Sequence, residues 1–94
     1  ILINSKEPEL RDIAHLRLAG LLLDEKKHDE ALKLLENEHS EFFDSLYGDL
    51  EGDIYADKGD ASMAISAYKI AMSKIDKKET RYKIIQMKID ALNK

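Results

Sequence analysis

The 94-residue chain contains no cysteine and no tryptophan, only one proline and four glycines. The absence of cysteine excludes disulfides, thiolate chemistry and cysteine-ligated zinc, and it is compatible with either a reducing or an oxidising compartment. So few prolines and glycines favour a helical protein with short loops. No apolar run approaches the ~18 residues of a membrane span, because the densest run, residues 16–23, is too short.

The sequence also lacks a secretory signal pattern and opens on Ile1 without a methionine. We therefore expect a fragment of a longer protein in which residues 1–8 are the remnant of an upstream helix or linker and residues 9–94 form the domain. A chain of this length folds as one domain and buries roughly 60–65% of its unfolded surface.

Sequence motifs of catalysis are missing as well. There is no Gly-x-Ser-x-Gly, no phosphate-binding loop and no His-Glu-x-x-His, and no serine has a histidine at a recognisable spacing. His28 and His39 are expected to be solvated loop residues, and His15 to be partly buried with its hydrogen bonds satisfied. We predict that the domain is not an enzyme and that it holds no catalytic, cofactor or metal site.

The net charge of −4 conceals an asymmetry along the chain. Residues 1–60 carry 16 acids and 7 bases, whereas residues 61–94 carry 3 acids and 8 bases. This distribution is compatible with head-to-tail pairing, with two different partners, or with two solvated helix faces of opposite sign. Nucleic acid is not an expected partner, because the domain is acidic overall and only Tyr82 is placed to stack within the basic tail.

Hydrophobic spacing predicts five helices, at about residues 9–24, 29–36, 41–57, 61–75 and 79–92. Pro8 stands near the first turn of the first helix, and Ser40 and Asp60 are good N-caps for the third and fourth. We expect the core-facing residues of the fourth helix to be Met63, Ala64, Ala67, Tyr68 and Ala71.

Small and aromatic residues recur at fixed spacings in the third and fourth helices. The residues concerned are Gly52, Tyr55, Gly59, Ala64, Tyr68 and Ala71. Small side chains at Gly52 and Ala64 allow two antiparallel helices to cross closely, and Gly59 ends the third helix in a left-handed conformation. In a first copy of the pattern, Ala19 and Ala31 occupy the equivalent positions. That copy departs from the pattern at Lys26, where a glycine is usual, and at Glu38, where a small residue is usual.

This pattern resembles the tetratricopeptide repeat (TPR). The resemblance implies an all-α fold of antiparallel hairpins in a right-handed superhelix, with repeat one at residues 9–38, repeat two at residues 40–75 and a capping helix at residues 79–92. An unrelated helical bundle is the alternative.

A wider resemblance covers residues 10–93. The runs Gly52-Asp53-Ile54-Tyr55-Ala56-Asp57-Lys58-Gly59 and Gln86-Met87-Lys88-Ile89-Asp90 are similar to the C-terminal domain of YfgM-type ancillary subunits of the bacterial SecYEG translocon. Membership would imply an upstream membrane helix, a repeat domain on the periplasmic side of the inner membrane, and work with chaperones on exported proteins. A generic soluble, cytoplasmic TPR adaptor or assembly factor is the alternative.

The TPR resemblance implies that the first helix of each hairpin lines a protein-binding face. The residues at these positions include Leu46, Asp49, Leu50, Asp53, Asp57 and Arg17. Acids beside leucines suit a basic, partly apolar segment of a partner, and they disfavour a clamp for a C-terminal carboxylate. Alternatively, the apolar residues of this face pack against upstream helices, and the first helix then provides an edge through which the chain self-associates as a homodimer.

Overall fold

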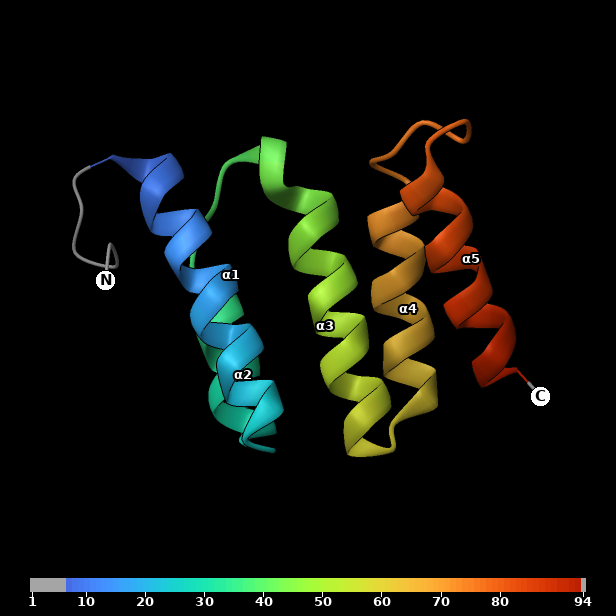
Figure 1. Ribbon diagram of the computed structural model, residues 1–94, viewed down its shortest axis with the longest axis horizontal. Coiled ribbons are helices and arrows are strands. Elements are labelled where there is room, and N and C mark those ends of the chain that lie inside the picture. Colours follow the sequence, from blue (N-terminus) through green and yellow to red (C-terminus); the bar gives the residue numbers. More distant parts are fainter. Residues whose placement is uncertain (1–6, 94) are drawn as a thin grey trace.

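The computed structural model describes residues 7–93, and every regular element in that range is helical (Figure 1). The elements are α1 (Pro8–Asp24), α2 (His28–Leu35), a single 3₁₀ turn η1 (Glu41–Phe43), α3 (Asp44–Lys58), α4 (Ala61–Met72) and α5 (Thr80–Leu92). The expected stretch of residues 1–8 therefore lies mostly outside the described residues, and Pro8 already forms the first turn of α1.

The helices follow one another through the molecule as hairpins (Figure 1). α1 packs on α2, α3 on α4, and α5 on α4, while α3 also contacts both helices of the first hairpin. α3 is therefore the element that joins the two halves. This arrangement confirms the prediction of an all-α, TPR-like fold with two hairpins and a closing helix.

Two hydrophobic clusters fill the interior. The first contains the buried residues Ala19, Ala31, Leu35, Phe43, Tyr47 and Ile54, contributed by α1, α2, η1 and α3. The second contains Ala64, Tyr68, Ala71, Met72, Ile85 and Ile89, contributed by α4 and α5, with Tyr55 of α3 packed against it. The predicted repeat residues Ala19, Ala31, Ala64, Tyr68 and Ala71 are all buried, but Met63 is exposed, so its predicted inward position is wrong.

The second hairpin is built on glycine contacts between α3 and α4. The ring of Tyr68 lies against the backbone of Gly52, where a Cβ atom would overlap three ring atoms. One turn earlier, a Cβ on Gly48 would lie 3.0 Å from the Cβ of Ala71. Gly59 then ends α3 at φ +94°, and the Asp60 side chain caps α4 by accepting from the Met63 N–H at 3.1 Å. The close crossing of α3 and α4 that the sequence predicted at Gly52 is therefore present, and the aromatic ring that packs on Gly52 is that of Tyr68.

Both departures from the repeat pattern have structural counterparts in the first hairpin. Lys26 takes the left-handed conformation usually given to glycine, at φ +63°, so the turn is preserved. α2 ends at Leu35 and stops short of Glu38. By the 33-residue offset of the repeats, His15 stands where Gly48 stands in the second hairpin, and Glu38 where Ala71 does. The first hairpin thus has a histidine and a glutamate at the positions where the second hairpin has glycine and alanine in close contact.

Other boundaries differ from the expectation by one turn. Ser40 caps η1, accepting from the Phe42 N–H at 3.3 Å, and α3 proper begins only at Asp44. The N–H of Ser40 is already bonded to Asp12 Oδ2 at 2.8 Å, which fixes where the chain enters the turn. α4 ends at Met72, three residues before the predicted end. His15 is 9% exposed, and within residues 7–93 its Nδ1 has no hydrogen-bond partner, so the expected satisfied histidine is wrong.

Alanine at Gly52 and at Gly20 should have opposite effects on stability. Gly52→Ala should lower the free energy of unfolding by about 1–3 kcal/mol, because Tyr68 must move away from the new methyl group. Gly20→Ala should raise it by about 0.5–1 kcal/mol, because no atom lies within 4 Å of its Cβ position and alanine is the better helix former. Urea denaturation of both variants measures the difference, and equal effects would contradict the close packing of α3 on α4.

Candidate functional site

The candidate partner-binding residues of the second hairpin form one line along α3, which we term the α3 stripe: Leu46, Asp49, Leu50, Asp53 and Asp57. Their spacing of three or four residues places them on one side of the helix. Leu46 is 38% exposed, and Leu50 is half-buried against the first cluster. Arg17 is exposed on α1 and is not part of the stripe.

Two acids of the α3 stripe share one lysine of α5. Lys88 Nζ donates to Asp49 Oδ1 and to Asp53 Oδ1, both at 3.0 Å. Asp53 Oδ1 also accepts from the hydroxyl of Tyr68 at 2.5 Å, and the ammonium of Lys88 lies 5.6 Å from the centroid of the Tyr68 ring. The acids are therefore held by a lysine and a tyrosine from two other helices.

The protonation equilibria of this network favour its charged form. Burial lowers the pKa of Lys88, but the hydrogen bonds and charges of Asp49 and Asp53 outweigh burial and raise it above the usual lysine value. Burial and the bond to Asp53 both raise the pKa of Tyr68. The lysine is therefore charged and the tyrosine neutral throughout the physiological range.

The third acid of the α3 stripe, Asp57, is bound by residues of the first hairpin. Its two oxygens lie 2.9 Å from Lys26 Nζ, and Oδ2 lies 2.7 Å from Nε2 of His28. These hydrogen bonds, from His28 first and then Lys26, lower the pKa of Asp57. A neighbouring bond from Lys58 to Asp29 also joins the end of α3 to the start of α2. His28 is thus an interhelical contact, and the predicted solvated loop histidine is wrong.

His39 likewise belongs to a packed cluster. Its ring stacks on Tyr47 with centroids 3.8 Å apart, and its Nε2 lies 2.8 Å from Asp44 Oδ1. Both residues line a surface cavity of about 270 Å³ together with the half-buried Glu51. Burial raises the pKa of Glu51, which the charge of His39 partly offsets. The prediction of a solvated loop is wrong for this histidine too.

The basic tail is also tied to α3. Besides Lys88, Arg81 Nη1 donates to Ser45 Oγ at 3.1 Å, and Lys74 Nζ lies 3.7 Å from Asp44 Oδ2. Two bases of the tail, Lys74 and Lys88, thus pair with acids of α3, and the charge asymmetry seen in the sequence is offset in part within the chain.

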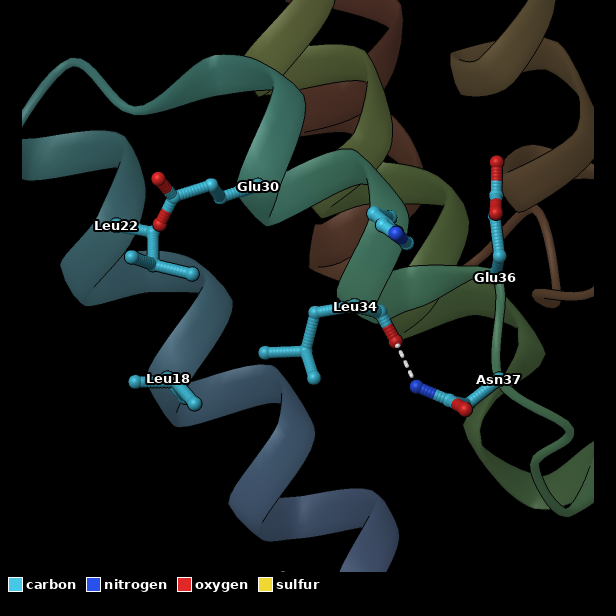
Figure 2. Close-up of a pocket in the computed structure, with 7 residues that line it drawn as sticks. Leu18, Leu22, Glu30, Leu34, Glu36 and Asn37 are labelled. Atoms are coloured by element: carbon cyan, nitrogen blue, oxygen red, sulfur yellow. Dashed lines mark hydrogen bonds between the residues drawn. The ribbon is translucent and has the colours of Figure 1, made fainter.

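A second hollow lies between α1 and α2. Figure 2 shows Leu18 and Leu22 of α1 facing Leu34 of α2, with Glu30 above them. The groove has a volume of about 580 Å³, and Lys33, Glu36 and Asn37 complete its rim. Sequence reasoning did not single out this groove, because the three leucines are indistinguishable from ordinary core positions by spacing alone.

Two searches of the described residues gave negative results. Within residues 7–93, no group of three or more histidine, aspartate or glutamate side chains is placed to hold a metal ion. Over the same residues, no helix is both long enough and apolar enough to cross a bilayer. The side chains of the α3 stripe and of the groove between α1 and α2 make apolar contacts and ion pairs.

Removing Lys88 should expose the dependence of α5 on the α3 stripe. Lys88→Met should lower the free energy of unfolding by about 1 kcal/mol, because Asp49 and Asp53 then face each other without a cation. Adding Asp49→Asn should recover part of that loss in a double-mutant cycle followed by thermal melting. The exposed Lys83→Met is the matched control, and an equal loss there would contradict the bridge.

Glu51→Gln should stabilise the fold in a pH-dependent way. Because the pKa of Glu51 is raised in the folded state, the folded protein binds more protons than the unfolded one above the usual glutamate pKa, so ionising Glu51 costs stability as pH rises. The variant should match the wild type below about pH 4 and exceed it at neutral pH. Denaturation at several pH values, with Glu38→Gln as the exposed control, measures this, and a pH-independent difference would refute it.

Comparison with known proteins places the chain in a family. A family model described as a tetratricopeptide repeat-like domain matches residues 1–94. Proteins named ancillary SecYEG translocon subunit from Neisseria gonorrhoeae and from Escherichia coli K12 are each 32% identical over 92 residues, and one from Buchnera aphidicola is 27% identical over 90 residues. No solved structure matches the chain significantly.

The alignments cover 96–98% of this chain but only 44–46% of the relatives, so the chain spans less than half the length of the curated proteins it matches. The hairpins, the glycine contacts between α3 and α4 and the full-length family match agree with one another. The chain belongs to the tetratricopeptide repeat-like domain family, and over nearly its whole length it is similar to proteins named ancillary SecYEG translocon subunits.

Proposed function

We propose that this domain is a non-catalytic protein-interaction module of an ancillary factor of the Sec translocon. In this proposal the whole protein is anchored in the bacterial inner membrane, the domain faces the periplasm, and it works with chaperones on exported proteins. The proposal is supported mainly by the three relatives named ancillary SecYEG translocon subunit, each of which aligns with at least 96% of the chain.

The ion pairs of the α3 stripe bear on which kind of partner it would bind. Lys88 already binds Asp49 and Asp53, and Lys26 already binds Asp57, so these acids are largely neutralised before any partner arrives. A basic segment that binds these acids therefore competes with the internal lysines for them. Leu46 is the most exposed apolar residue of the stripe and needs no such exchange. We therefore propose that partners contact Leu46 mainly through apolar side chains, with the charges governing encounter rate and selectivity.

Crosslinking in membranes tests this role. A photoreactive amino acid at position 46 of the full-length protein should capture translocon subunits, periplasmic chaperones or secreted chains, whereas the same probe at exposed Met63 of α4 serves as the control. Capture of cytosolic proteins alone would support a soluble adaptor and overturn the proposal.

A substitution at the same position tests the binding surface. Leu46→Glu should weaken capture of those partners by about tenfold, since it places a charge in an apolar contact worth about 1–2 kcal/mol. Met63→Glu should leave capture unchanged, and circular dichroism should show the same helical content in both variants. Equal capture by Leu46→Glu and the wild type would remove the α3 stripe from the proposal.

A further inference from the structure

Leu21 of α1 is an apolar side chain left open at one end of the molecule. It is 60% exposed, which makes it the most exposed leucine of residues 7–93. α1 is the first helix of the described chain, and the hairpin that it forms with α2 stands at one end of the row of helices (Figure 1). An open leucine at this place contrasts with the environment of the same position in the second hairpin.

The matching residue of the second hairpin is Ile54. Leu21 and Ile54 are 33 residues apart, and the same offset relates Lys26 to Gly59, which both take the left-handed conformation after the first helix of their hairpin. Ile54 is fully buried, and it packs in the cluster that α3 shares with α1 and α2. Ile54 is thus covered by the hairpin that precedes it in the chain, whereas Leu21 is not covered.

α5 shows the same relation to the hairpin before it. The apolar residues that pack on the preceding hairpin have one spacing in both helices: Tyr47, Leu50 and Ile54 in α3, and Tyr82, Ile85 and Ile89 in α5. In α1 this spacing gives Ala14, Arg17 and Leu21, of which Ala14 is buried but the other two are exposed. Both helices that follow a hairpin therefore bury these positions on it, and in α1 the same positions are partly open.

An acid near the turn marks the same contact. Asp57 of α3 lies 2.9 Å from Lys26 Nζ and 2.7 Å from His28 Nε2, and both partners belong to the turn and the start of α2 in the preceding hairpin. Asp24 stands 33 residues before Asp57. It is exposed, and within residues 7–93 its carboxylate has no hydrogen bond and no ion pair. A basic residue in the turn of a hairpin before α1 would reach Asp24 in the same way.

These observations select a helical hairpin of the same protein as the occupant. The cover of Ile54 and the partners of Asp57 both come from the preceding hairpin of the same chain, so the repeat itself supplies the pattern for α1. The relatives have length for such a segment, because the part of each that lies outside the alignment is longer than the aligned 90 to 92 residues. One repeat takes only 33 residues.

We propose that in the full-length protein a further helical hairpin before α1 packs on this face, covers Leu21 with apolar side chains and pairs a basic residue of its turn with Asp24. The inference does not depend on the translocon role, which requires only the α3 stripe. Because Leu21 and Asp24 are on α1, the added hairpin leaves Leu46 of the α3 stripe available to other partners.

Thiol labelling of the full-length protein tests the cover of Leu21. Residues 1–94 contain no cysteine, so one can be placed at a chosen position, with any cysteine elsewhere in the protein replaced by serine. Leu21→Cys should react with a maleimide at least about tenfold more slowly than Met87→Cys, each rate being divided by that of the same variant unfolded in urea. Met87, which is 68% exposed on α5, is the matched control.

Dilution of the labelled protein separates the occupants. Protection by a preceding hairpin should be the same at nanomolar and micromolar protein concentration, because the contact lies within one chain. Protection that disappears on dilution would identify a second copy as the occupant. Equal rates at positions 21 and 87 in the purified protein would show a face open to a different protein. Either of these two results would overturn the proposal.

Substitution of Asp24 tests the charge pair by the sign of its effect. A carboxylate in the last turn of a helix opposes the helix dipole, so without a partner Asp24→Asn should raise the melting temperature or leave it unchanged. With a basic partner it should lower the melting temperature of the full-length protein by about 1–4 °C, as Asp57→Asn should. Glu38→Gln, at an exposed acid, is the control and should have no effect. A melting temperature that Asp24→Asn raises or leaves unchanged would overturn the pairing.

Discussion

The contact between the ring of Tyr68 and the backbone of Gly52 is the constraint on which the rest of the structure depends. It brings α3 and α4 close enough for Gly48 and Ala71 to touch one turn away. It also holds the Tyr68 hydroxyl against Asp53, and Asp53 in turn binds Lys88 of α5. The absence of a side chain at Gly52 thus determines where the Tyr68 ring, Asp53 and α5 lie.

The pairing of charged residues follows from this placement of α3, α4 and α5. Acids of α3 and bases of α5 are far apart in the sequence, yet three of the basic residues bind polar atoms of α3 or its neighbourhood. A surface whose acids are already bound attracts cations more weakly than its sequence implies, because an incoming cation competes with the lysines already paired with those acids. Selectivity then depends more on shape and apolar contact than on net charge.

The fold was predictable from the sequence because its determinants are local. Small and aromatic residues at fixed spacing predicted the two hairpins, and Gly59 and Asp60 predicted the sharp turn between α3 and α4. The end of α2 was also predicted to within one residue, at 36 against the observed Leu35, whereas the end of α4 was placed three residues too late, at 75 against the observed Met72.

The candidate site was predictable only in outline. The α3 stripe follows from helical spacing, but the partners of its acids do not, because Lys88, Lys26 and His28 reach them across 29 to 39 residues of sequence. Nothing in the local sequence distinguishes these three side chains from the other exposed bases and histidines. The same holds for His39, whose stacking on Tyr47 requires the tertiary fold.

The two hydrophobic clusters have a consequence for which positions tolerate change. Ile54 and Tyr55 are neighbours in the sequence, yet Ile54 belongs to the first cluster and Tyr55 packs on the second. α3 therefore packs on both clusters, and a substitution at one of its buried positions disturbs both halves of the molecule. α1 and α5 each border one cluster and keep an open flank, so variation and new contacts can accumulate at the two ends while the middle helix stays nearly fixed.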